Sequence, residues 1–408
     1  MTGTASSTAR LQNMRSFAAL LLFLAVACER DRPQGELIEG EAAGAAFLVR
    51  FAERLPESER ADVEKIVGDT LERVSSRVSS SLPESDLSRI HRAAAGVETP
   101  VAAETFEVMR EAVRVSELTG GAFDVTVAPL ARLWGFGAGV SVISVPPTGE
   151  EIERERARVG FANLVLDDDS LTITKRIESL ELDLTGIATG YALDLAAEAL
   201  EERGYKDYLI EAGAEVRTRG RDAAGEPWQV PVVKPGPGRG EIQRNVPLSG
   251  FSMATSGDFR GADEGGALTG KLHAHLVDPR TGRPLDHGLL SVTVLGDTCL
   301  TADALSMGLL VLGPEEGFRL AADEDLAALF LVRSESGALE ERATPVFAEL
   351  FLTPKSRLGV APRWAPPALS KERGGGARRA PSSPSEERGE RAERSPQPQS
   401  GGGGAPPL

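Results

Sequence analysis

The chain has few cysteines and no excess of basic residues. Only two of its 408 residues are cysteines, so no framework of disulfides holds the fold together. Lysine and arginine number 45 against 61 acidic residues, which gives a formal net charge of −16. A nucleic-acid-binding protein needs a basic face to neutralise phosphates, and no basic cluster interrupts the body of the chain. We therefore expect no nucleic-acid partner.

The N-terminal apolar run is too short to cross a bilayer. Arg10 and Arg15 precede the eleven apolar residues FAALLLFLAVA, which suit the core of a signal peptide. Cys28 follows at once, as in a bacterial lipobox, where the thiol is diacylated and becomes the mature N-terminus. A plain secreted protein, whose ordinary cleavage Ala25 and Ala27 would allow, is the alternative. We expect residues 1–28 to be a signal peptide, and the protein to be an exported, membrane-anchored lipoprotein facing the periplasm.

The rest of the chain divides by composition into a tether, one folded body and a tail. Residues 29–40 form a short polar tether, and residues 41–364 hold the apolar patterns of a folded domain. Residues 365–408 contain no aromatic, valine or isoleucine residue, so they cannot bury enough apolar surface to fold and are predicted to be disordered. Within the body, strands come in runs and long helices precede or follow them, which favours an α+β fold with antiparallel or mixed sheets.

Periodicity predicts particular elements in this body. Apolar spacing near 3.6 residues predicts helices over 59–79, 102–124, with a stop at Gly120 and Gly121, and 190–205. A further helix includes TADALSMGLLVLG, residues 301–313. Strands are predicted over 45–53, 208–220, 228–235, 250–257, 271–278 and 289–296.

Two glycine-rich stretches could bind a ligand. In TGGAFD, paired glycines allow a sharp turn or a close backbone approach, and Asp124 follows Phe123. A helix stop with Asp124 as a local cap is the alternative. In LDLTGIATGYALD, Gly186 and Gly190 flank the start of a helix, where free N–H groups favour an anion, and Asp183 ends a predicted strand. Many strand-to-helix turns are glycine-rich, so a purely structural turn stays open.

Two further stretches carry candidate metal ligands. His273 and His275 alternate on a predicted strand and would face one side, although spacing assigns no third zinc ligand. In TADALSMG, Thr301 is a candidate N-cap that would place Asp303 in the first turn of a helix. Asp303 is then either an ordinary first-turn acid or a metal ligand. Ser256 lies in TSGD rather than G-x-S-x-G, which disfavours a hydrolase nucleophile.

Taken in order, these stretches resemble the ApbE-type flavin transferases. The matching phrases span about residues 40–350 and are SDLSRI, TGGAFDVTVAPLARLWGFG, LDLTGIATGYALD, EAGAEVRTRG, PWQV, ATSGDFR, HLVDPRTGRP and TADALSMGLLVLGPEEG. The resemblance implies a two-lobed α+β fold that binds FAD, with Mg²⁺ on the pyrophosphate. It implies an enzyme that passes FMN from FAD to a threonine hydroxyl of an exported acceptor protein and releases AMP.

The resemblance also assigns residues. The FAD site would comprise Ala122, Phe123, Asp124, Asp183, Thr189 and the backbone at Val277. The metal would be held by the carboxylate of Asp303, which is also assigned to catalysis, and by the carbonyls of Gly186 and Ser306. His275 is the candidate for proton transfer. Its alternative role is to fix the strand-turn geometry by hydrogen bonding.

Four positions depart from the family pattern. Thr189 stands where a lysine is usual, and Met307 stands where a threonine is usual. The Met-Gly-Thr phrase is replaced by Ala43, Gly44 and Ala45, and a usual aromatic by Ser81. The first change removes a cation that would face phosphate, and the second a hard oxygen ligand. Two alternatives to transferase activity therefore stay open, an FAD pyrophosphatase that gives FMN and AMP, and a catalytically weak flavin-binding lipoprotein.

Overall fold

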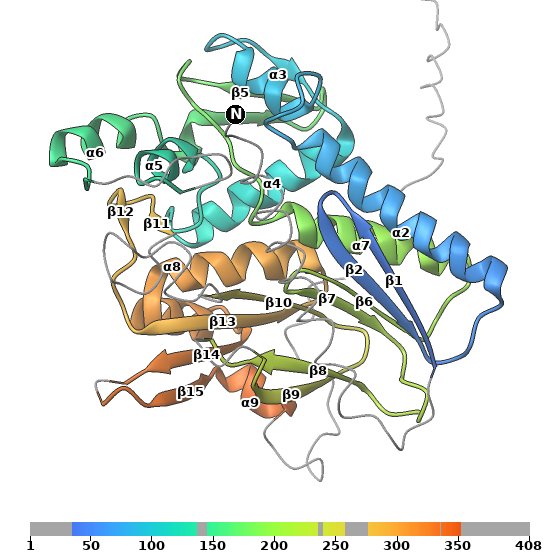
Figure 1. The fold of residues 1–408 in the computed structure, drawn as a ribbon. Coiled ribbons are helices and arrows are strands. Elements are labelled where there is room, and N and C mark those ends of the chain that lie inside the picture. The colour runs from blue at the N-terminus through green and yellow to red at the C-terminus, as the bar shows by residue number, and fades with distance from the viewer. Residues whose placement is uncertain (1–34, 137–144, 236–239, 258–275, 335, 352–408) are drawn as a thin grey trace, which may run out of the picture. The chain divides into compact units, whose positions relative to one another are not determined.

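The computed structural model describes residues 35–136, 145–235, 240–257, 276–334 and 336–351. Its largest sheet has eight antiparallel strands in the order β1-β2-β6-β7-β10-β13-β14-β15 (Figure 1). These strands are β1 (Glu36–Ala42), β2 (Ala45–Phe51), β6 (Tyr208–Ala212), β7 (Glu215–Arg219), β10 (Ser252–Gly257), β13 (Leu289–Gly296), β14 (Ala327–Arg333) and β15 (Leu339–Ala343).

Smaller sheets and helices complete the described part. The sheet strands are β3 (Thr99–Pro100), β4 (Leu164–Asp167), β5 (Thr172–Lys175), β8 (Trp228–Val233), β9 (Ile242–Leu248), β11 (Val277–Asp278) and β12 (Arg283–Pro284). The helices are α2 (Glu57–Arg77), α3 (Asp86–Arg92), α4 (Ala103–Leu118), α5 (Ala128–Leu133), α6 (Gly149–Arg156), the 3₁₀ turn η1 (Phe161–Asn163), α7 (Ala188–Glu202), α8 (Cys299–Asp323) and α9 (Pro345–Phe351). No helix among the described residues combines the length and apolar composition that a membrane span requires.

The large sheet is buried on both faces, because alternate residues of its strands enter different cores. Phe330 of β14 packs in the core that includes residues of α4 and α8, whereas its neighbours Leu329 and Leu331 pack in the core shared with β8, β9 and α9. In β2, Phe47 packs against α2 and α7, whereas Leu48 faces the opposite core. The helices that carry the predicted site, α7 and α8, thus cover one face of the sheet.

Several predicted elements are confirmed. The helices α2, α4 and α7 and the strands β2, β8, β10 and β13 lie where periodicity placed them. α4 ends at Leu118, and Gly120 and Gly121 follow with φ of +58° and +81°, a backbone conformation that favours glycine.

Other predictions were wrong. Residues 208–220 form two strands rather than one, because Gly213, with φ of +69°, turns the chain between β6 and β7. The residues before Asp183 form no strand among the described elements. The folded body begins before the predicted boundary at Glu41, since β1 starts at Glu36 and pairs with β2.

The start of α8 also differs from the prediction. Thr298, not Thr301, is the N-cap, and its hydroxyl accepts a hydrogen bond from the Thr301 N–H at 3.3 Å. Asp303 is therefore not a first-turn residue. It lies in the second turn, where its side chain is buried.

Candidate active site

The first turns of α7 and α8 lie against each other, and the predicted metal ligands gather at this junction. The Gly190 N–H, in the first turn of α7, donates to Asp303 Oδ2 at 3.2 Å. A Cβ on Gly190 would lie 2.4 Å from the carbonyl oxygen of Cys299, so only glycine permits this approach. Ile187, which precedes α7, supplies no capping side chain, and Asp303 accepts one of the N–H groups that a helix start leaves unpaired.

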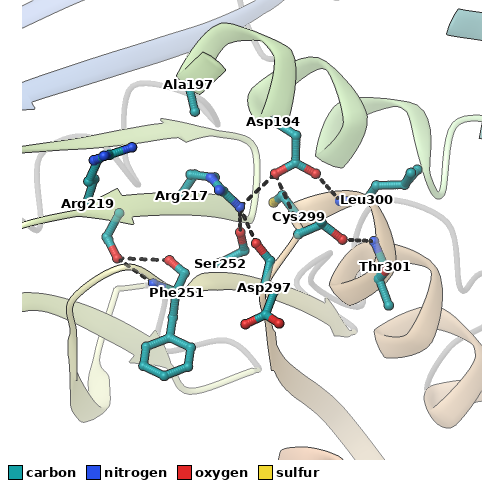
Figure 2. A network of polar contacts seen from close by, with 12 residues as sticks. Asp194, Ala197, Arg217, Arg219, Phe251, Ser252, Asp297, Cys299, Leu300 and Thr301 are labelled. Atoms are coloured by element: carbon teal, nitrogen blue, oxygen red, sulfur yellow. Dashed lines mark hydrogen bonds and ion pairs between the residues drawn. The ribbon is translucent and has the colours of Figure 1, made fainter. Parts of the chain in front are cut away.

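A second carboxylate makes the reciprocal contact. Asp194 of α7 accepts hydrogen bonds from the N–H groups of Cys299 and Leu300, both at 2.9 Å, in the first turn of α8 (Figure 2). Arg217 of β7 donates to Asp194 Oδ1 at 3.1 Å and to Ser252 Oγ at 3.0 Å. Each helix therefore supplies a carboxylate that caps the start of the other.

Burial and neighbouring charge favour the neutral form of the Asp303 carboxyl group. Burial, with a smaller contribution from the charge of Asp194, raises the pKa of Asp303 to about 7, although the Gly190 bond opposes this. Burial and the charge of Asp303 likewise raise the pKa of Glu215. A bound cation would favour the charged form of Asp303, so the chemistry of this carboxylate fits a metal ligand.

The oxygen donors fit magnesium better than zinc. In the described part of the chain, no group of three or more His, Cys, Asp and Glu residues could hold a metal ion. Magnesium needs few protein ligands and is usually bound through one or two carboxylates, substrate phosphates and waters. Asp303 could supply the carboxylate, with backbone carbonyls nearby.

The two other predicted metal ligands are Ser306 and Gly186. Ser306 contacts Asp303, and Gly186 lies beside Met307. Ser306, buried in α8, donates to the Asp303 carbonyl at 2.9 Å and its hydroxyl lies 2.7 Å from Ser256 Oγ. A Cβ on Gly186 would lie 3.9 Å from Met307 Cγ and Cε and from the ring of Phe123. The structure thus brings Gly186 and the 303–307 turn together, and it places a thioether at their contact.

Comparisons with known proteins identify the family of the chain. The ApbE family model matches residues 44–330. The chain belongs to the ApbE family. An FAD:protein FMN transferase of Vibrio cholerae is 33% identical over 329 residues, covering 80% of this chain and 96% of that protein. One of Haemophilus influenzae is 34% identical over 329 residues, covering 78% and 92%.

Solved structures of the ApbE family share the fold. The flavin transferase ApbE of Vibrio cholerae matches with a TM-score of 0.69 and 32% identity, covering 78% of this chain and 99% of that one. The flavinyl transferase ApbE of Pseudomonas stutzeri, in its apo form, matches with a TM-score of 0.69 and 32% identity, covering 80% and 99%. The predicted α+β fold is confirmed.

Among the FAD-site residues predicted from the ApbE resemblance, Asp124 has the most polar contacts. Asp124 is buried and caps its own turn: Oδ1 accepts from Thr126 N and Oγ1 at 2.8 and 2.6 Å, and Oδ2 from Phe161 N at 2.9 Å. This is the local cap that the sequence left open. Burial raises the pKa of Asp124, and this residue lines a cavity of about 400 Å³ together with Gly121, Phe161 and Arg280.

The structure also locates Ala122, Asp183, Thr189 and Val277, the other predicted residues of the FAD site. The Asp183 N–H donates to the Val125 carbonyl at 2.7 Å, so the LDLTG and TGGAFD stretches meet. Asp183 Oδ1 accepts from Thr185 N at 2.9 Å and Oγ1 at 2.7 Å. Val277 is buried in a small core with Leu130, Trp134 and Ile152, Ala122 is buried, and Thr189 is the second residue of α7. His273, His275 and Cys28 lie outside the described residues.

Sequence reasoning missed Asp194 and Arg217. Both stand inside quoted stretches, GYALD and EAGAEVRTRG, but received no role. The available signal was the spacing of Asp194 four residues after Gly190, which places both on one face of α7.

Proposed function

We propose that this ApbE-family protein transfers FMN from FAD to a threonine hydroxyl of an exported acceptor protein and releases AMP, with Mg²⁺ as the metal. Family membership supports the flavin transfer. The observation that carries the site is the meeting of the starts of α7 and α8, where Asp303 accepts the Gly190 N–H of a 15-residue helix and Met307, one turn later in α8, lies beside Gly186. A helix start of this kind favours phosphate groups through its N–H groups and dipole.

Each of the proposed site residues has a distinct role. The carboxylate of Asp303 and the carbonyls of Gly186 and Ser306 would hold the cation, which when bound neutralises the charge growing on the phosphoryl oxygens. The start of α7 would orient the pyrophosphate. The threonine oxygen forms a new bond to the phosphorus of the FMN half, the bond to the AMP oxygen breaks, and AMP leaves with that electron pair. We assign acceptance of the threonine proton to His275.

Two other outcomes use the same site. If water replaces threonine, the products are free FMN and AMP, and the protein is an FAD pyrophosphatase. If the site binds FAD without turnover, the protein is a weak flavin-binding lipoprotein, an outcome that the thioether of Met307 beside Gly186 would favour. Incubation with FAD, Mg²⁺ and a threonine-bearing acceptor separates the three: covalent flavin fluorescence on the acceptor, free FMN with AMP, or intact FAD.

The decisive variant is Asp303→Asn. The amide oxygen can still accept the Gly190 N–H, so the junction keeps its hydrogen bond while the anionic metal ligand is lost. Because the buried charge is itself unfavourable without a cation, we expect no loss in thermal stability. Labelling of the acceptor should fall by at least about 100-fold.

The matched control is Asp86→Asn. Asp86 is also buried and accepts a backbone hydrogen bond, from Ala102 N at 3.1 Å, but it lies in α3. This control should keep its labelling activity. Full Mg²⁺-dependent labelling by Asp303→Asn would contradict the assignment of Asp303 to the metal.

A further inference from the structure

The junction of α7 and α8 depends on more than Asp303. The Asp303–Gly190 contact is a single hydrogen bond of 3.2 Å, whereas Asp194 accepts two at 2.9 Å from consecutive N–H groups of α8. Those N–H groups belong to the first turn, which has no acceptors within its own helix. The stronger part of the reciprocal contact is therefore made by Asp194.

Arg217 fixes this carboxylate from the side of the sheet. Its guanidinium Nη1 donates to Asp194 Oδ1, to Ser252 Oγ in β10 and to the carbonyl of Asp297 just before α8 (Figure 2). Burial raises the pKa of Asp194 to about 6, and the positive charge of Arg217 opposes that shift. The guanidinium of Arg217 thus connects the large sheet, α7 and the residue that precedes α8.

The position of Asp303 follows from this attachment. Cys299, whose N–H binds Asp194, lies four residues before Asp303, about one helical turn. A helix transmits a shift of its first turn to the next, so the Asp194 bonds set where the Asp303 carboxylate stands relative to Gly186. A Cβ added to Gly190 would lie only 2.4 Å from the Cys299 carbonyl oxygen, so the two helices are closely packed at this point.

We infer that Asp194, held by Arg217, is a positioning residue that orients Asp303 toward the metal and pyrophosphate. This inference rests on the proposed function and adds to it a residue that touches neither substrate nor metal. It predicts that a change at Asp194 weakens Mg²⁺ binding, besides any effect on stability.

The test is calorimetric titration of Mg²⁺ into the full chain saturated with FAD, without acceptor. Asp194→Asn retains one amide oxygen for two N–H groups and removes the charge that faces Arg217. We expect its Mg²⁺ dissociation constant to rise at least 10-fold, about 1.4 kcal/mol. Asp86→Asn, which also loses a buried charge that accepts a backbone hydrogen bond, should leave the Mg²⁺ constant unchanged even if it lowers the melting temperature.

A second variant keeps the inference testable if Asp194→Asn does not fold. Arg217→Lys retains the positive charge but cannot reproduce the contacts of the guanidinium, so we expect a smaller rise of about 3-fold in the Mg²⁺ constant. Wild-type Mg²⁺ affinity in Asp194→Asn, or in Arg217→Lys if Asp194→Asn does not fold, would overturn the inference and leave the proposed function standing. Failure of the wild-type protein to bind Mg²⁺ and to label an acceptor would overturn both.

Discussion

Met307 is the residue whose chemistry fits the proposed reaction least well. A Cβ on Gly186 would lie 3.9 Å from its side chain, and the family resemblance assigns the Gly186 carbonyl to the metal. The same resemblance expects a threonine, not a methionine, at position 307. A thioether is a soft donor, whereas magnesium prefers hard oxygen. Met307 also packs on the main core beside Phe123, so it contributes apolar contact in place of a ligand.

Met307→Thr should therefore restore a hydroxyl where magnesium can use it. We expect the Mg²⁺ concentration for half-maximal FMN transfer to fall by about 3- to 10-fold, since the added donor is a hard oxygen. Lost packing should lower the free energy of unfolding by about 1 kcal/mol. Both quantities come from activity titrations and chemical denaturation.

The same substitution at Met253 is the matched control. Met253 is buried in the core on the opposite face of the sheet. Met253→Thr should reduce stability without changing the Mg²⁺ dependence. An unchanged Mg²⁺ requirement in Met307→Thr would show that this side chain does not face the metal.

At the scale of elements, the sequence predicted those parts whose signals are local. The apolar period of α2, α4 and α7 lies within each helix, and the glycine pair after α4 marks its end without reference to the rest of the chain. At the start of α8, however, Thr298 and Thr301 are the same residue type and equally good N-caps. Residue type alone therefore did not determine that the helix starts after Thr298.

The candidate site was predictable only in part, because its decisive contacts join distant segments. Asp194 binds the N–H of Cys299 across 105 positions, and Gly190 binds Asp303 across 113. No periodicity reports such a pairing. The resemblance to the ApbE family supplied Asp303 and Gly186, whereas Asp194, although it ends the matched stretch LDLTGIATGYALD, was assigned no role there.

His91 connects α3 to the segment that leads into the site. Its Nε2 accepts the Leu182 N–H at 2.8 Å, next to Asp183, and this requires a neutral imidazole. Burial lowers the pKa of His91 below 6.5, Lys175 and Arg132 add to this, and Glu181 opposes it. The folded chain therefore binds this proton less well than the unfolded chain, so the stabilising contribution is present above pH 6.5 and is lost as the pH falls through the lowered value.

His91→Gln tests that dependence, because an amide oxygen can accept the Leu182 N–H but does not titrate. We expect the free energy of unfolding of the wild type to decrease more steeply than that of the variant between about pH 7 and pH 5. Denaturant titrations at several pH values measure both slopes. Parallel slopes would show that the His91–Leu182 bond does not link stability to pH.

At the scale of the whole molecule, we propose that catalysis and anchoring belong to different parts of the chain. The described site residues lie between Ala122 and Met307, and the junction of α7 and α8 lies on one face of the large sheet. Cys28 belongs to a segment outside the described residues, and its proposed role is acylation. Removal of that thiol should change the localisation of the protein but not the FMN transfer activity of its site.

Cys28→Ser should therefore move the protein from the membrane fraction of bacterial cells to the soluble exported fraction, because the signal segment remains and the acylated thiol does not. Purified protein should keep wild-type FMN transfer and Mg²⁺ dependence. Labelling of a membrane-bound acceptor in cells should decline, since anchoring in the same bilayer raises the effective concentration of the two partners. Cys299→Ser, at the only other cysteine, is the control and should stay in the membrane fraction. Retention of Cys28→Ser in the membrane would require an anchor other than a lipid on this thiol.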